Sequence, residues 1–159
     1  MSTDHRFDVV ALGEPLIEFN QVRGGDAHAW RQGYGGDTSN MAIAAARLGV
    51  RVAYGTRLGD DAFGREFRAL WSAEGVALDG VATDPDAPTG VYFVTHGPAG
   101  HAFAYLRAGS AASRLAPSNL PPDASNGFTN TRVTTTAIQN DYRSDFTGTS
   151  ASTPMVSGV

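Results

Sequence analysis

The apolar positions in the first two thirds of the chain switch repeatedly between the strand period and the helix period. Residues 7–13 and 50–54 are short apolar runs that predict buried strands. Residues 38–48 and 61–74 instead carry apolar side chains at helical spacing, and a glycine follows each segment as a stop signal. Alternation of this kind predicts an α/β layer fold.

Two further strands are expected beyond these elements. Residues 90–95 and 101–106 are two short strand-like segments around the turn-rich stretch 97–100, which predicts a β-hairpin. The helix over 38–48 is expected to be capped by Thr38 or Ser39. Asp84, Pro85 and Asp86 are interpreted as a turn and not as a catalytic pair of carboxylates.

The composition changes near Pro121 and Pro122. The stretch before this point is rich in alanine, whereas the stretch beyond it is rich in threonine. Beyond the change the pattern predicts one strand over 132–136, followed by a Gly/Thr/Ser loop over 147–152.

Charge and residue usage exclude several classes of protein. The 159 residues hold 12 basic and 16 acidic side chains, a net charge of -4 that gives no dense positive field for nucleic acid. All basic residues are arginines, so no lysine is present for a phosphate-cradling P-loop. The absence of cysteine excludes disulfides, thiol nucleophiles and Cys-ligated zinc. The early apolar run over 9–12 is too short for a membrane helix or a signal sequence, so we expect no membrane partner.

The sharpest local feature is the stretch Gly33-Tyr34-Gly35-Gly36-Asp37-Thr38-Ser39-Asn40. Paired glycines that enter a helix allow the backbone to approach a ligand while the first helical N–H groups point at it. The alternative is a tight strand-to-helix turn whose glycines only avoid steric clashes. His96 and His101 flank the hairpin turn and are too isolated to predict a metal site.

Several motifs occur in the order and spacing of one known family. Gly35-Gly36 is followed by Asn40, Gly49 and the stretch 59–64, which resembles the N-terminal signature of the ribokinase-like (PfkB) carbohydrate kinases. Within that family, Gly13-Glu14-Pro15-Leu16 and the stretch 105–113 are similar to 2-keto-3-deoxygluconate kinases. The resemblance covers residues 7–124. It implies an incomplete ribokinase-like three-layer α/β sandwich with a small β-hairpin lid, in a cytoplasmic protein.

The resemblance also implies a substrate site for a small sugar acid. Its residues fall into a group that would hold sugar hydroxyls and a group that would hold the far end of the substrate. The first group is Gly36, Asp37 and Asn40, and the second is Tyr92, Tyr105 and Arg107. The planar guanidinium suits a carboxylate, and tyrosines combine apolar faces with polar tips. The alternative is that both tyrosines point inward from neighbouring strands and that Arg107 is a solvated edge residue.

The family also implies ATP and Mg²⁺ as cofactors, and a catalytic base in a late Gly-Ala-Gly-Asp type motif. No such motif occurs in the 159 residues, and the residues that would bind ATP are expected to be absent. We therefore expect an ATP-dependent carbohydrate kinase by resemblance, but no turnover by this chain.

The last residues resemble a different family. From about Phe128 to Val159 the chain is similar to the nucleophile segment of subtilisin-like serine proteases, with Ser150 at the nucleophile position. The alternative is a match by composition alone. No Asp-Thr-Gly or His-Gly-Thr element is present and no histidine follows His101, so we expect Ser150 to be exposed and inert.

The two resemblances together predict a composite chain. Residues 1–124 would be the N-terminal part of a kinase domain and residues 125–159 a protease fragment, with the junction between Ala124 and Phe128. The leading function is sugar-acid recognition without turnover, and the alternative is a serine endopeptidase fragment. A third possibility is no biochemical function, because half of an α/β sheet leaves strand edges unpaired and prone to self-association.

Overall fold

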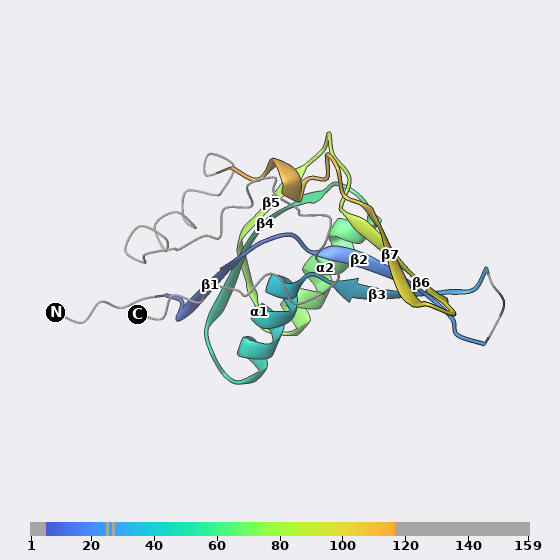
Figure 1. Ribbon diagram of the computed structural model, residues 1–159. Helices are drawn as coiled ribbons and strands as arrows, with labels where there is room; N and C mark the ends of the chain where they lie inside the picture. The colour runs from blue at the N-terminus through green and yellow to red at the C-terminus, as the bar shows by residue number, and fades with distance from the viewer. Residues whose placement is uncertain (1–5, 25, 27, 117–159) are drawn as a thin grey trace.

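The computed structural model describes residues 6–24, 26 and 28–116. Three parallel strands form its base: β1 (Val9–Leu12), β4 (Val52–Gly59) and β5 (Ala77–Asp84). They lie in the order β1-β4-β5, so each new strand is added on the same side of the previous one (Figure 1). The strand predicted over 7–13 is confirmed, and the one predicted over 50–54 is longer than expected.

Two helices connect these strands. The helix α1 (Asp37–Arg47) leads into β4 and α2 (Ala62–Ala73) leads into β5, and both pack on β4. Figure 1 shows them on the same side of the parallel sheet. Both helices were predicted from their apolar spacing. They supply one helical layer, and the described residues do not test the second layer of the predicted three-layer sandwich.

The core lies between the helices and the parallel sheet. Tyr54, Phe67 and Trp71 are fully buried there, and the Trp71 ring centroid lies 4.6 Å from that of Tyr54 and 5.2 Å from that of Phe67. The Trp71 indole N–H donates to Ser39 Oγ at 2.8 Å, which joins α2 to the first turn of α1. This contact satisfies a polar group that burial would otherwise make costly.

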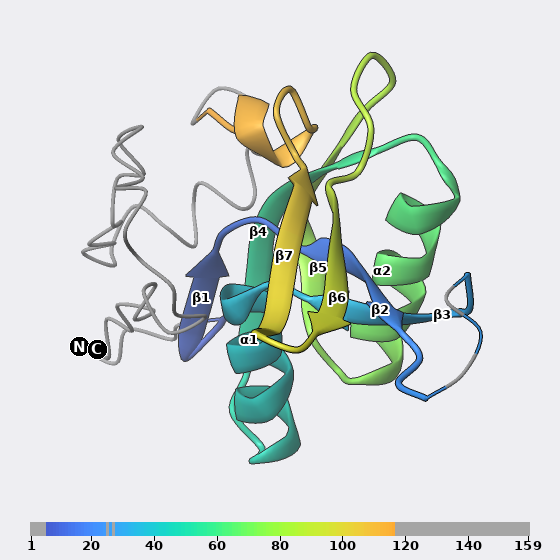
Figure 2. The ribbon, with the colours of Figure 1, turned by 45° about the vertical axis from the view of Figure 1, so that its right-hand side comes forward.

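A second sheet covers one edge of this base (Figure 2). Its strands are β2 (Leu16–Gln21), β3 (Trp30–Gly35), β6 (Val91–Gly97) and β7 (Gly100–Leu106), in the order β3-β2-β6-β7. The β2–β6 pair is parallel, and the two outer pairs are antiparallel. We call these four strands the lid sheet. The predicted hairpin is confirmed as β6 and β7, but it is only half of a larger sheet.

The lid sheet packs on α2 through aromatic rings. Phe19 of β2 lies edge-on to Phe63 with 6.1 Å between centroids, and Tyr34 of β3 lies edge-on to Phe67 at 5.4 Å. One face of the lid sheet therefore continues the hydrophobic core.

The two helices begin in different ways. Asp61 caps α2 by accepting a hydrogen bond from the Gly64 N–H at 2.7 Å. At α1 the cap residue is Gly36, with no side-chain cap, so the prediction of Thr38 or Ser39 as the cap is wrong. The physical reason is that both hydroxyls face the core, where Thr38 Oγ1 lies 2.8 Å from the Tyr54 hydroxyl and Ser39 accepts from the Trp71 indole.

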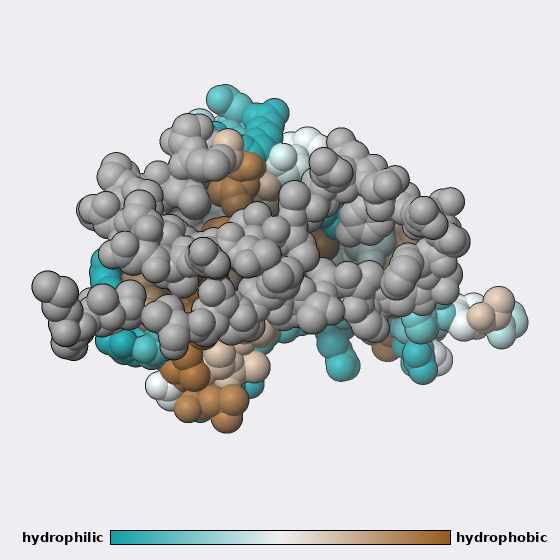
Figure 3. Space-filling model, turned by 60° about the vertical axis from the view of Figure 1, so that its left-hand side comes forward, coloured by the Kyte–Doolittle hydropathy of each residue, from teal (hydrophilic) through white to brown (hydrophobic). Residues whose placement is uncertain are grey.

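Apolar side chains also reach the surface. Figure 3 shows hydrophobic surface at the lower edge of the molecule, the level at which α1 ends in Figure 1. Leu48, directly after α1, is 84% exposed. Within the described part of the chain, no helix has the length and apolar character needed to span a bilayer. The predicted strand over 132–136 and Ser150 lie outside the described residues.

Candidate functional site

The chain passes between the lid sheet and the rest of the fold at four places. These linkers are residues 13–15 after β1, Gly36 after β3, residues 85–90 after β5, and residues 107–111 after β7. The lid sheet is therefore connected to the rest of the fold through these four linkers. The predicted site residues belong to these linkers or to elements that border them.

The Gly35-Gly36 turn brings backbone unusually close to its neighbours. Gly36 has a φ of +102°, and a Cβ there would lie 2.6 Å from the Glu14 carbonyl oxygen and 3.0 Å from Pro15 Cα. A Cβ on Gly35 would lie 2.6 Å from the Tyr92 hydroxyl. Both positions therefore require glycine for space, and Gly36 also requires it for its backbone conformation.

Tyr92 and Tyr105 lie side by side on β6 and β7. They are paired across the two strands, and their rings stack with centroids 5.7 Å apart and planes 25° apart. Tyr105 is 50% exposed, whereas Tyr92 is half-buried. The stacked rings form a partly open aromatic surface, which suits the apolar face of a sugar ring.

The Tyr92 hydroxyl donates a hydrogen bond to Glu18 of β2, which also accepts from the Asn20 amide at 3.1 Å. Burial raises the pKa of Tyr92, and the neighbouring Glu18 raises it further, with smaller contributions from Tyr105 and Asp37. Tyr92 is therefore a neutral hydrogen-bonding group at physiological pH, and Asp37 lies close enough to affect it electrostatically.

Arg107 follows β7 and forms an ion pair with Glu14. Its Nη2 lies 2.6 Å from Glu14 Oε2, and the Ser110 hydroxyl donates to Glu14 Oε1 at 2.6 Å. The Glu14 side chain is 9% exposed and that of Arg107 is 27% exposed. Burial raises the pKa of Glu14, although the hydrogen bond from Ser110 and the charge of Arg107 act in the opposite direction.

Asp37 and Asn40 lie in the first turn of α1, and both are exposed. The Asn40 backbone N–H donates to the Gly36 carbonyl at 3.0 Å, so the turn is closed directly after the glycine. The structure thus brings Gly36 beside Glu14, and Glu14 beside Arg107. It also places Tyr92 against Gly35 and beside Tyr105. Ser150 lies outside the described residues.

Sequence reasoning missed three polar residues of this region: Glu14, Glu18 and Ser110. Glu14 and Ser110 lie within the family motifs but have no role assigned from them, and Glu18 lies in no motif. The available signal was an acidic residue between Gly13 and Pro15, where a buried strand meets a turn. Its partners Arg107 and Ser110 lie more than 90 positions away, so no local pattern could have paired them.

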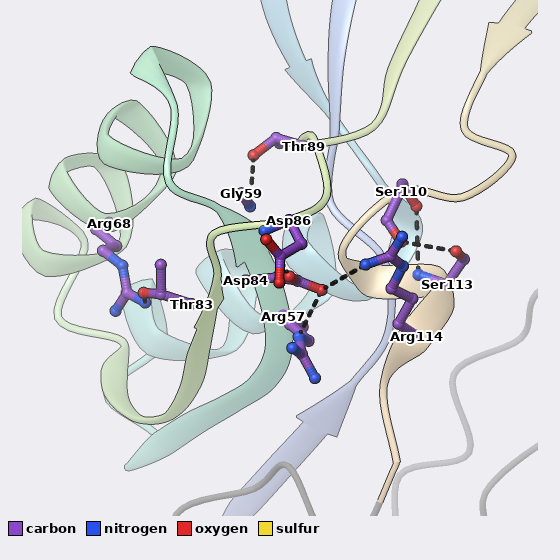
Figure 4. Close-up of polar contacts among 10 residues, drawn as sticks. All are labelled: Arg57, Gly59, Arg68, Thr83, Asp84, Asp86, Thr89, Ser110, Ser113 and Arg114. Carbon is purple, nitrogen blue, oxygen red and sulfur yellow. Dashed lines mark hydrogen bonds and ion pairs between the residues drawn. The ribbon is translucent and has the colours of Figure 1, made fainter.

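The segment after Arg107 also contacts the parallel sheet and the linker that follows β5. The Ala111 N–H donates to the Pro88 carbonyl at 2.8 Å. In the short helix η1 (Ala112–Arg114), Arg114 reaches the buried Asp84 at 3.5 Å, and Arg57 Nε lies 3.0 Å from the same carboxylate (Figure 4). The hydrogen bond from the Asp86 N–H and the two arginines hold the pKa of Asp84 below its usual value, despite its burial.

The predicted turn at Asp84, Pro85 and Asp86 is confirmed, since the Asp86 N–H donates to Asp84 Oδ1 at 2.9 Å. Nearby, Asp61 accepts hydrogen bonds from both the N–H and the hydroxyl of Thr89, at 2.7 Å and 2.9 Å. In the described ranges no three His, Cys, Asp or Glu side chains gather as they would around a metal ion.

Comparison with known proteins supports the resemblance seen in the motifs. The sequence profile of the "pfkB family carbohydrate kinase" matches residues 6–141, which extends past the predicted junction at 124–128. A 2-dehydro-3-deoxygluconokinase of Thermoproteus tenax is 39% identical over 118 residues, covering 70% of this chain and 36% of the relative. Fructokinase-2 of Solanum habrochaites is 38% identical over 120 residues, covering 72% of this chain and 37% of the relative. The chain thus spans little more than a third of these relatives.

Solved structures agree with this assignment. A PfkB protein from Polaromonas sp. JS666 superposes with a TM-score of 0.66 at 33% identity, covering 72% of this chain and 40% of that one. A sugar kinase from Pyrococcus horikoshii in complex with ATP gives a TM-score of 0.66 at 27% identity, covering 72% and 38%. These matches show the mixed α/β fold that the sequence predicted. On the extent of the profile match and the identity to these relatives, the chain belongs to the pfkB family of carbohydrate kinases.

Proposed function

We propose that this chain binds the substrate of a sugar kinase, and that the substrate is a sugar acid of the 2-keto-3-deoxygluconate type. The observation that carries the proposal is the position of Arg107, half-buried and held by Glu14, in the linker that follows the strand of Tyr105. A fixed guanidinium near an aromatic surface and a glycine turn is suited to a ligand that has both hydroxyls and a carboxylate.

Each group has a distinct role in this proposal. Asp37, Asn40 and the backbone at Gly36 hold hydroxyls, because Asp37 and Asn40 are exposed at the start of α1, where the first N–H groups have no partner within the helix. Tyr92 and Tyr105 line the apolar face of the ligand. Arg107 pairs with the carboxylate, which distinguishes a sugar acid from a neutral sugar such as fructose. One of the relatives compared is named for a sugar-acid substrate and another for fructose, so the arginine is the group to test.

ATP and Mg²⁺ belong to the proposed kinase activity, since the neighbour from Pyrococcus horikoshii was solved with ATP. The described residues do not fit these cofactors: they contain no acidic cluster for a metal, and the chain has no lysine to contact phosphates. We therefore derive no step through ATP. A polypeptide of these 159 residues is proposed to bind sugar acid without phosphoryl transfer, because transfer requires positioned phosphates and a base.

Calorimetric titration of the purified chain tests the proposal. We expect binding of 2-keto-3-deoxygluconate in preference to fructose, and loss of that preference in Arg107→Ala. Charge-assisted pairing contributes about 1.5–3 kcal/mol, which corresponds to a roughly tenfold to hundredfold loss. Arg47→Ala is the matched control, because Arg47 is an exposed arginine paired with Glu74 at the end of α1. Equal affinity for both sugars, or ADP formation in a coupled assay, would contradict the proposal.

A serine hydrolase centred on Ser150 is a second candidate, supported by the resemblance of residues 128–159 to a protease nucleophile segment. An unassisted serine hydroxyl reacts slowly, so we expect no fluorophosphonate labelling beyond the background seen in Ser150→Ala. Fast labelling abolished by the substitution would favour this candidate. The composite origin stays a prediction, which the flanking nucleotide sequence would test.

A cytoplasmic location is also part of the proposal. Self-association through an unpaired strand edge is a further part of it. The strand β7 ends the lid sheet, and all seven of its residues are exposed. An exposed edge offers unpaired backbone groups to a second chain. Size-exclusion chromatography over a concentration series measures this directly, and a monomer at all concentrations would exclude it.

A further inference from the structure

Glu14 occupies the point at which the four linkers between the two sheets converge. It lies in the first linker itself, and the third linker passes beside it at Gly90, where a Cβ would lie 2.9 Å from Glu14 Oε1. The second linker is Gly36, whose Cβ position lies 2.6 Å from the Glu14 carbonyl oxygen. The fourth linker supplies Arg107 and Ser110, one to each carboxylate oxygen. One residue therefore contacts every crossing of the chain.

The burial of this carboxylate calls for an explanation beyond packing. Removing a carboxylate from water costs several kcal/mol unless charge and hydrogen bonds compensate. Both oxygens of Glu14 are satisfied, and the side chain is nearly closed to solvent, whereas its partner Arg107 is three times more exposed, at 27% against 9%. The Glu14 carboxylate is thus buried, whereas the Arg107 guanidinium is partly accessible to solvent.

We infer that Glu14 is a positioning residue that fixes the Arg107 guanidinium at the base of the lid sheet and thereby sets the preference for a sugar acid over a neutral sugar. This inference rests on the proposed function. An arginine side chain loses rotamer entropy when it is immobilised, and a ligand must overcome that loss unless the side chain is already held. Its guanidinium has five N–H donors in a rigid plane, so anchoring at Nη2 orients the whole group.

One opposing effect exists, because the charge of Glu14 also repels an incoming carboxylate. The burial of Glu14 and its hydrogen bond from Ser110 direct both oxygens away from solvent and toward the protein. We therefore expect orientation to outweigh repulsion. The sign of the change in affinity when Glu14 is neutralised decides between the two effects.

The test is Glu14→Gln, which keeps the shape and an acceptor for Ser110 but removes the charge that holds Arg107. We expect 2-keto-3-deoxygluconate to bind about tenfold more weakly in calorimetric titration, with fructose binding changed less than about twofold. In an Arg107→Ala background the same substitution should cause no further loss. Glu74→Gln is the matched control, since it breaks another Glu–Arg pair, with Arg47, away from the lid sheet. It should change neither affinity.

A measurement without ligand separates this inference from the proposed function. The side-chain N–H signals of Arg107 in proton–nitrogen NMR, assigned with Arg107→Lys, should be resolved in the native chain and lost by exchange in Glu14→Gln. If the native chain binds no sugar acid, the proposed function fails, whatever the NMR result. If it binds but Glu14→Gln strengthens sugar-acid binding, weakens both sugars equally, or leaves the Arg107 signals unchanged, the inference is overturned.

Should Glu14→Gln not fold, Ser110→Ala supplies the same comparison with both charges kept. It releases one oxygen of Glu14 and is expected to weaken sugar-acid binding about threefold while fructose binding is unchanged. An equal effect on the two sugars overturns the inference.

Discussion

The buried hydrogen bond between Trp71 and Ser39 provides a direct test of how the two helices are held together. The indole N–H and the serine hydroxyl are 2.8 Å apart, and the two residues are 0% and 1% exposed. In Ser39→Ala the indole N–H loses its acceptor in a place that water does not reach. A buried donor left unsatisfied costs about 1–3 kcal/mol. The cavity left by one oxygen atom is small, so the polar loss dominates.

Thermal and urea unfolding followed by circular dichroism measure this cost. For a folded unit of about a hundred residues, each kcal/mol lowers Tm by roughly 4 °C or more. The same substitution is then made in a Trp71→Phe background, where no indole donor exists. We expect Ser39→Ala to cost clearly less there, because neither partner is left unpaired. Equal costs in the two backgrounds would refute the reasoning.

Three further predictions concern the linkers and the site. Gly36→Ala should destabilise the protein by about 1–3 kcal/mol in urea unfolding, more than Gly49→Ala, because Gly49 shares the positive φ but has open space around its Cβ position. Asp61→Ala should cost about 1–2 kcal/mol as a lost helix cap. Burial alone would raise the pKa of Asp61, but its hydrogen bonds lower it below the usual value. The stabilisation by Asp61 is therefore complete above about pH 4. In acid unfolding it should be lost as the pH falls through the lower pKa of the folded state. Tyr92→Phe removes the hydroxyl that donates to Glu18 but keeps the ring, so sugar-acid binding should change less than about twofold in calorimetry, while the free energy of unfolding falls by about 1–2 kcal/mol.

The elements predicted from the sequence are those with strong local patterns. The apolar stripe of α2 and the glycine after it fixed that helix almost to the residue, because the helical period is visible within a dozen positions. The strands β2, β3 and β5 were not predicted. The strand β3 reads Trp-Arg-Gln-Gly-Tyr-Gly, with two glycines and two long polar residues, and its conformation depends on pairing with β2. Pairing of this kind is a tertiary property that local preference does not encode.

The same distinction applies to the contacts of the candidate site residues, whose role in binding stays a prediction. The glycine turn and the hairpin tyrosines carry local signals, and the structure places the Tyr92 hydroxyl next to Gly35. The partners of those residues could not be predicted, because each is contributed by a different strand or linker. Glu18 reaches Tyr92 only through the parallel pairing of β2 with β6, and Glu14 reaches Arg107 only where the first and last linkers meet.

The lengths of the linkers determine how the lid sheet can respond to a ligand. The first linker, residues 13–15, joins β1 to β2, and the second, Gly36 alone, joins β3 to α1, so the lid sheet has almost no slack at these two crossings. Short linkers restrict rigid-body rotation, so we expect any opening of the lid sheet to turn about the cluster where the linkers meet. Glu14→Gln keeps the shape of the side chain, so we expect it to change the placement of Arg107 more than the angle of the lid sheet. Gly36→Ala lies in the same cluster but does not touch the ion pair, so comparing it with Glu14→Gln separates lid angle from guanidinium orientation.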